Sequence, residues 1–190
     1  MGSLIALGLP GVPVEVPLLA TMVVLGAASV GLGHPEDDVL RRVAVAAFPE
    51  IHPRSPDRAS DRRHLAAKLA AADFGMTQFF WEVEHYERMV AELADLGCTT
   101  PVLPGVMPFV NVAGARRMSA SSCATVPASL QERIDVVDGD PEATRKLGVE
   151  VATDLVAGLL ELGVPGVHLY ALNRANAITE SYDNLAIRPT

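Results

Sequence analysis

A chain of 190 residues, 49% of them hydrophobic, is long enough for one domain with a sizeable buried core. Its formal net charge of −8, without any basic cluster, argues against a nucleic-acid-binding protein. The two cysteines, Cys98 and Cys123, are too few for a disulfide framework and lack the spacing of a zinc site. We therefore expect no metal centre, and two buried, reduced thiols in a cytoplasmic protein.

Residues 1–42 form an atypical apolar segment. Between Leu4 and Gly33 the single charged residue is Glu15. The apolar run from Leu18 to Gly33 is 16 residues long, shorter than the roughly 20 that a membrane-spanning helix needs, and no basic residue precedes it as in a signal peptide. We expect no membrane span. The segment fits a buried strand pair, a weakly membrane-associating stretch or an addition foreign to the fold.

From residue 43 apolar runs of strand length alternate with helical patterns. The run Val43–Phe48 is continuous, which is typical of a strand covered on both faces. Similar runs predict strands at Gly75–Phe80, Pro101–Pro104 and Val167–Leu172.

Helices are expected between and after these strands. The clearest start is Asp140-Pro141-Glu142, which combines an N-cap acid, proline at the first helical position and an acid in the first turn. Ser60 is the expected N-cap of the first helix. The expected helices are Ser60–Ala72, a helix ending at Leu96 before Gly97, Asn111–Ala120, Leu130–Val137, Asp140–Leu162 and Ala175–Leu185.

Strand–helix alternation repeated four times predicts a parallel α/β fold. Four such units are similar to half of a (β/α)8 TIM barrel, whose complete form needs about 250 residues. Residues 43–190 are therefore predicted to form a partial barrel. A half barrel leaves two strand edges unpaired. Either residues 1–42 cover them, or copies of the chain associate as a homo-oligomer, or the chain is a truncated or degenerate copy.

Polar residues follow the predicted strands at their carboxyl ends, where ligand sites of parallel α/β proteins lie. These are His52, Gln78, Asn111 and the pair Asn173-Arg174. A neutral amide such as Gln78, placed beside aromatic rings, suits a flat heterocycle because it donates and accepts hydrogen bonds together. Spacing alone favours the alternative of a solvent-facing Gln and core phenylalanines. The fork of Arg174 suits a carboxylate or planar ring substituents.

Asp61, His64 and Lys68 project from one side of the helix after the first strand. They could hold a phosphate and a ribose hydroxyl. Taken alone, the three residues favour a solvated face with an ordinary ion pair. The sequence contains no Gly-rich phosphate loop and no Ser–His–Asp arrangement, and Glu50 and Glu82 have no evident partner for acid–base work.

Five motifs occur in one order and at the spacing of a known family. Together they resemble the carboxyl-terminal half of methylenetetrahydrofolate reductase, over about residues 43–188. The motifs are Ala47–Pro53, Asp61-x-x-His64 with Lys68, Thr77–Phe80, Pro104–Pro108 and Tyr170–Arg174.

The resemblance implies a cytoplasmic flavoprotein of one-carbon metabolism and methionine biosynthesis, with FAD across the carboxyl ends of barrel strands. Hydride from NADH or NADPH would reduce 5,10-methylenetetrahydrofolate to 5-methyltetrahydrofolate, with the redox chemistry carried by the cofactor. By the same resemblance the FAD-binding residues are Phe48, His52, Asp61, His64, Ala67 and Lys68. The implied substrate-binding residues are Gln78, which would meet the pterin and the nicotinamide in turn, Phe79 and Arg174.

The chain departs from the family in ways that bear on catalysis. The family's acidic glutamate and its aspartate near the flavin have no counterpart in residues 1–42, so the catalytic residue is not identified. Gly114 stands where the family often has a folate-binding Gln, and Met118 where it often has a ring-stacking Phe. Three functions follow as alternatives: the reductase, an inactive half-barrel remnant or assembly partner, and a flavin- or folate-binding module without chemistry.

Overall fold

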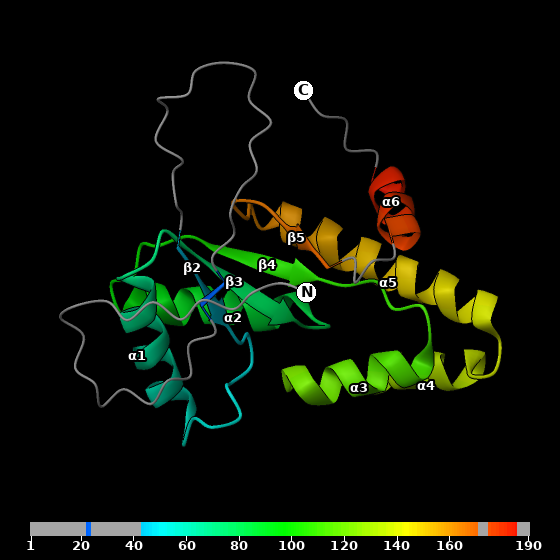
Figure 1. The fold of residues 1–190 in the computed structure, drawn as a ribbon, viewed down its shortest axis with the longest axis horizontal. Helices are drawn as coiled ribbons and strands as arrows, with labels where there is room; N and C mark the ends of the chain where they lie inside the picture. Colours follow the sequence, from blue (N-terminus) through cyan, green and yellow to red (C-terminus); the bar gives the residue numbers. More distant parts are fainter. Residues whose placement is uncertain (1–21, 24–42, 171–174, 186–190) are drawn as a thin grey trace, which may run out of the picture.

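The computed structural model describes residues 22–23, 43–170 and 175–185 (Figure 1). The strands are β1 Met22–Val23, β2 Ala44–Ala47, β3 Phe74–Phe79, β4 Val102–Val106 and β5 His168–Leu169. The helices are α1 Arg58–Leu69, α2 Val83–Asp95, α3 Val112–Ser122, α4 Ala128–Val137, α5 Pro141–Glu161 and α6 Ala175–Asn184.

The five strands form one sheet in the order β1-β2-β3-β4-β5, in which β2 to β5 run parallel. This arrangement confirms the predicted α/β class with four parallel strands. The short β1 pairs antiparallel with β2 over Ala44 and Val45. Residues 22–23 therefore cover the β2 edge, which is one of the alternatives raised for residues 1–42. The rest of residues 1–42 lies outside the described residues.

Helix starts follow from capping side chains. Asp57, not Ser60 as predicted, caps α1: its Oδ1 accepts a hydrogen bond from the Ser60 amide at 2.7 Å. Both residue types cap helices well, and the one three residues upstream reaches the free amide. The predicted cap Asp140 is confirmed, since its carboxylate accepts from the amides of Glu142 and Ala143.

One face of the sheet packs against α1, α2 and α5. Val45 and Ala47 of β2 share a buried cluster with Leu69, Met89 and Leu159 from these three helices. Along β3 burial alternates: one set of side chains is buried, whereas Phe74, Met76 and Gln78 are half-buried. The prediction of strands covered on both faces therefore fits β2, in which all residues but Ala46 are buried, better than it fits β3.

A second buried cluster lies at the carboxyl ends of β3 and β4, where it joins them to α3, α4 and α5. Its large members are Phe79, Trp81, Phe109, Ile134 and Leu147. In Figure 1, α3 and α4 lie beyond the arrowheads of β3 and β4, on the opposite side of the sheet's end from α6. This cluster fixes the loop after β4.

Gly148 allows α5 to cross the chain at Phe109. A Cβ atom on Gly148 would lie 1.8 Å from the Phe109 carbonyl oxygen, which is a backbone atom.

Cys98 and Cys123 are free thiols, as predicted, but they are half-buried and not buried. They are partly accessible because they lie in the turns that end α2 and α3. Of the helices in the described ranges, none has the length and apolar character needed to cross a membrane.

Candidate functional site

The loops after β2, β3 and β4 leave the same edge of the sheet. Ala47 lies opposite Thr77, Phe79 opposite Gly105, and Val106 opposite Leu169. Because the four strands are parallel, this register brings their carboxyl ends to one edge. The predicted site residues at the end of β3 and in the loop after β2 therefore share one end of the sheet.

The loop after β2 is held by an aromatic contact and by backbone hydrogen bonds. The rings of Phe48 and His52 meet edge to face, with centroids 4.6 Å apart. The Arg54 amide donates to His52 Nδ1 at 3.1 Å, which requires an unprotonated Nδ1. Burial lowers the pKa of His52, and this favours the neutral ring. Phe48 and His52 thus form one rigid aromatic unit.

Asp61 is a buried carboxylate whose oxygens are already engaged. Its Oδ1 accepts from the His52 amide at 3.0 Å and from the Ser55 hydroxyl at 2.8 Å. Its Oδ2 accepts from Arg62 Nη1 at 2.6 Å. Asp61 therefore holds the loop around His52 in place. A ribose hydroxyl would have to share these oxygens, and the predicted ribose contact stays a prediction.

Lys68 reaches back from α1 to β2. Its Nζ donates to the carbonyl oxygen of Ala46 at 3.1 Å, and burial lowers its pKa, an effect that Asp61 opposes. An ammonium has three donors, so two remain for a ligand. His64 and Ala67 lie on the exposed part of α1. The predicted set is therefore split between buried and exposed positions.

Gln78 and Phe79 are neighbours on β3 with opposite environments. Gln78 is half-buried on the face that alternates with the buried side chains. Phe79 is 2% exposed and packs edge to face on Trp81, with centroids 5.1 Å apart. Gln78 is therefore partly accessible, whereas Phe79 belongs to the buried cluster that joins β3 to α3, α4 and α5. Arg174 and Asn173 lie outside the described residues.

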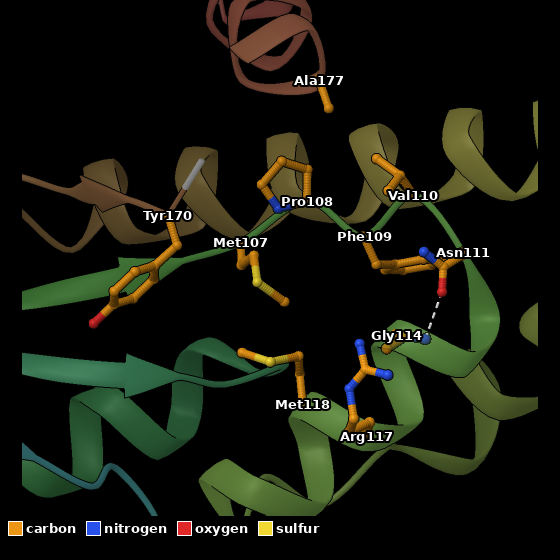
Figure 2. A pocket seen from close by; sticks show the side chains of 11 residues that line it. Met107, Pro108, Phe109, Val110, Asn111, Gly114, Arg117, Met118, Tyr170 and Ala177 are labelled. Carbon is orange, nitrogen blue, oxygen red and sulfur yellow. Dashed lines mark hydrogen bonds between the residues drawn. The ribbon is translucent and has the colours of Figure 1, made fainter. Parts of the chain in front are cut away.

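A cavity of about 230 Å³ opens beside the end of β4 (Figure 2). It lies between the loop after β4, one side of α3, Tyr170 and α6. Figure 2 shows the thioethers of Met107 and Met118 pointing toward one another across it. The lining residues are Met107, Pro108, Phe109, Val110, Asn111, Gly114, Ala115, Arg117, Met118, Tyr170 and Ala177.

Tyr170 closes one end of this cavity. Its hydroxyl donates to the Thr77 carbonyl oxygen at 2.7 Å, and burial raises its pKa. Its ring lies against Gly105, where a Cβ atom would come within 2.6 Å of Tyr170 Cε2. The glycine of the predicted Pro104–Pro108 motif therefore provides room for the aromatic ring.

Sequence reasoning missed Met107 and Arg117 as lining residues. Their signal was weak, because Met107 sits in a proline-bounded apolar turn and Arg117 is one of two consecutive arginines. One feature could have identified Arg117: it lies next to Met118 and one helical turn after Gly114. The resemblance had singled out both of these positions. Asn111, predicted at a strand end, caps α3 by accepting from the Gly114 amide at 2.6 Å. Within the described ranges no group of three or more His, Cys, Asp and Glu side chains could hold a metal ion.

Comparisons with known proteins agree with the motif order. The family model described as methylenetetrahydrofolate reductase matches residues 37–186. The 5,10-methylenetetrahydrofolate reductase of Escherichia coli is 32% identical over 148 residues, which cover 77% of this chain and 50% of that protein. A probable methylenetetrahydrofolate reductase (NADPH) of Caenorhabditis elegans is 31% identical over 147 residues, covering 76% of this chain and 22% of that protein. The chain thus spans half or less of these relatives.

Among solved structures, a protein from Clostridium thermocellum described as binding two copies of 5-methyl-5,6,7,8-tetrahydrofolic acid has a similar fold. Its TM-score is 0.51 at 13% identity, over 76% of this chain and 54% of that one. At this identity the likeness concerns the fold alone.

Proposed function

Because the chain belongs to the methylenetetrahydrofolate reductase family, we propose that it carries the folate- and flavin-binding half of a site that reduces 5,10-methylenetetrahydrofolate to 5-methyltetrahydrofolate. NADH or NADPH would be the hydride donor. One observation carries this proposal: the carboxyl ends of β2, β3 and β4 lie at the same end of the sheet. Gln78, the loop after β2 and the cavity beside β4 are all found at this end. The reaction is proposed for the site as a whole, and this chain covers half or less of its relatives.

The residues after β2 fit the demands of FAD. Lys68 keeps two N–H donors after its bond to Ala46, and a half-buried cation suits a diphosphate. The Phe48–His52 pair offers a flat aromatic surface held in place by hydrogen bonds. These residues and His64 would hold the cofactor, which when bound supplies hydride transfer.

Gln78 would orient the pterin or the nicotinamide. Its half-buried amide can donate and accept hydrogen bonds together, which both heterocycles require. Phe79 would act indirectly, because its buried ring packs on Trp81 and fixes the end of β3. Arg174 would contact the folate, as the family motif implies.

A binding module without turnover is the second candidate. One observation favours it: two carboxylates near the strand ends, those of Glu50 and Asp61, are engaged by the fold. Glu50 accepts from the Thr125 amide at 2.7 Å and from its hydroxyl at 2.5 Å, and Asp61 is held by its loop. Neither is placed as a free general acid.

An absorbance spectrum separates these candidates. The purified full chain is mixed with FAD, excess cofactor is removed, and the retained flavin band is measured. Retained flavin with NADH- or NADPH-dependent reduction of 5,10-methylenetetrahydrofolate supports the reductase. Retained flavin or bound 5-methyltetrahydrofolate without turnover supports the binding module. Folded protein that retains neither ligand contradicts both, and would leave an inactive remnant.

A further inference from the structure

Arg117 carries a guanidinium without a partner among the described residues. Its neighbour Arg116 donates to Asp135 at 3.0 Å and lies 3.6 Å from Asp138. In the described part of the chain no hydrogen bond or ion pair engages the Arg117 side chain. In a chain with a net charge of −8, an arginine beside a cavity without an ion-pair partner among the described residues is available to bind an anion.

The cavity places this cation beside two methionine side chains. Figure 2 shows the guanidinium of Arg117 on the Asn111 side of the cavity, with Met107 and Met118 between it and Tyr170. Thioethers make favourable contacts with aromatic rings. The cavity thus combines an apolar middle for a flat ring with a positive end.

None of the described lining residues repels an anion. The described lining contains neither aspartate nor glutamate. The Asn111 Oδ1 atom is occupied by the Gly114 amide. Arg117 would therefore not have to break an ion pair with another described residue in order to bind an anionic group at this end.

We propose that Arg117 determines substrate specificity by binding the carboxylates of a glutamyl tail attached to an aryl ring in this cavity. The inference rests on the proposed folate function and adds to it a residue and a ligand group. A guanidinium forms bidentate hydrogen bonds with a carboxylate, and lysine does not reproduce that fork. The cavity volume of about 230 Å³ is below that of typical ligand sites, about 300–1,000 Å³, so it fits a part of a folate and not the whole.

The test compares two ligands of nearly the same shape, of which one lacks the two negative charges. Calorimetry gives the Kd of the full chain for 5-methyltetrahydrofolate and for the same compound with both glutamyl carboxylates converted to amides. The wild-type chain should bind the acid about tenfold more tightly than the diamide, as expected for charge-assisted hydrogen bonds. Arg117→Met should remove most of this preference by weakening the binding of the acid form, and any remainder is the contribution proposed for Arg174.

Matched variants control for charge and for folding. Arg116→Met removes an adjacent arginine with its own partners and should keep the tenfold preference. Arg117→Lys should keep part of it. Because Arg117 is exposed, its variants should melt at the wild-type temperature.

The outcomes separate this inference from the proposed function. A wild-type chain that binds both forms equally, or an Arg117→Met variant that keeps the preference or weakens both forms alike, would overturn the role of Arg117 while folate binding stands. A folded wild-type chain that binds neither form would overturn both.

Discussion

Arg62 Nη1 donates to Asp61 Oδ2 at 2.6 Å, and both side chains are almost completely buried although the two residues are adjacent in the chain. The same guanidinium donates to the carbonyl oxygens of Phe48, Pro49 and Glu50. Its Nε donates to Glu92 of α2 at 2.7 Å. One arginine therefore ties α1 and α2 to the loop that carries Phe48 and His52.

Replacing Arg62 should be strongly destabilising. Arg62→Met leaves the Asp61 charge buried without its cation and three carbonyl oxygens without their donor. Removing one partner of a buried pair costs about 3–5 kcal/mol. Urea unfolding of both proteins measures the change in the free energy of unfolding.

Arg88→Met is the matched control, because Arg88 also pairs with Glu92 but is exposed. It should change the free energy of unfolding by about 1 kcal/mol or less. An Arg62→Met variant as stable as the Arg88→Met variant would contradict the role given to Arg62.

Gly148→Ala should destabilise the second cluster. The new methyl group would meet the Phe109 carbonyl oxygen, and backbone cannot move aside as a flexible side chain does. We expect a loss of about 3 kcal/mol in the free energy of unfolding, at the upper end of overpacking costs. The emission of Trp81, which packs on Phe109 with centroids 5.8 Å apart, should shift as well.

Gly158→Ala in the same helix serves as the control. Its Cβ would meet the Val83 side chain, and alanine gains about 1 kcal/mol of helix propensity over glycine. The two effects should nearly cancel. Equal losses for the two variants would show that helix position, and not the Phe109 contact, sets the cost.

The strand–helix order was predictable because it rests on local signals. Asp140-Pro141 defines a helix start within three residues, and the apolar run at Val43–Phe48 has strand length. The capping of α1 was not resolved, since Asp57 and Ser60 are equally good capping residue types. Which of the two residues caps the helix depends on where the loop after β2 joins it. Hydrogen bonds between the loop and residues about ten positions later in the sequence fix that point.

The candidate site was predictable in part. Motif order predicted Gln78 and the loop residues, and their common edge follows from the parallel strands. The burial of Arg62 was not predictable, because an arginine in a charged helix usually faces solvent. Its environment depends on Glu92 and on the Phe48–Glu50 carbonyls, which are brought to it by the fold and not by spacing.

Tyr86 should make stability depend on alkaline pH. Its hydroxyl donates to the Val102 carbonyl oxygen at 2.7 Å, and burial raises its pKa to about 12. Between about pH 10 and 12 the unfolded chain loses this proton and the folded chain keeps it. Stability is then fully present below pH 10 and falls by about 2–3 kcal/mol as pH rises to 12.

Tyr86→Phe isolates this contribution. The variant loses the hydrogen bond, which costs about 1–2 kcal/mol at neutral pH. Its free energy of unfolding should fall less steeply than that of the wild type between pH 10 and 12. Identical slopes in this range, measured by urea unfolding, would refute the assignment to Tyr86.

Met118→Phe should strengthen the binding of 5-methyltetrahydrofolate. Met118 faces Met107 across the cavity, and a phenyl ring in its place could stack on the aryl ring of a folate. Aromatic pairs contribute about 0.5–1.5 kcal/mol beyond the area they bury, so Kd should fall about threefold to tenfold. Calorimetry on the full chain measures this change.

Met118→Leu is the matched control, because leucine has a volume near that of methionine and no ring. It should leave Kd within about twofold of the wild-type value. An equal gain in the leucine variant would attribute the effect to apolar packing in general. Weaker binding in the phenylalanine variant would mean that the ring occupies the space of the ligand, and that the aryl group lies elsewhere on this edge of the sheet.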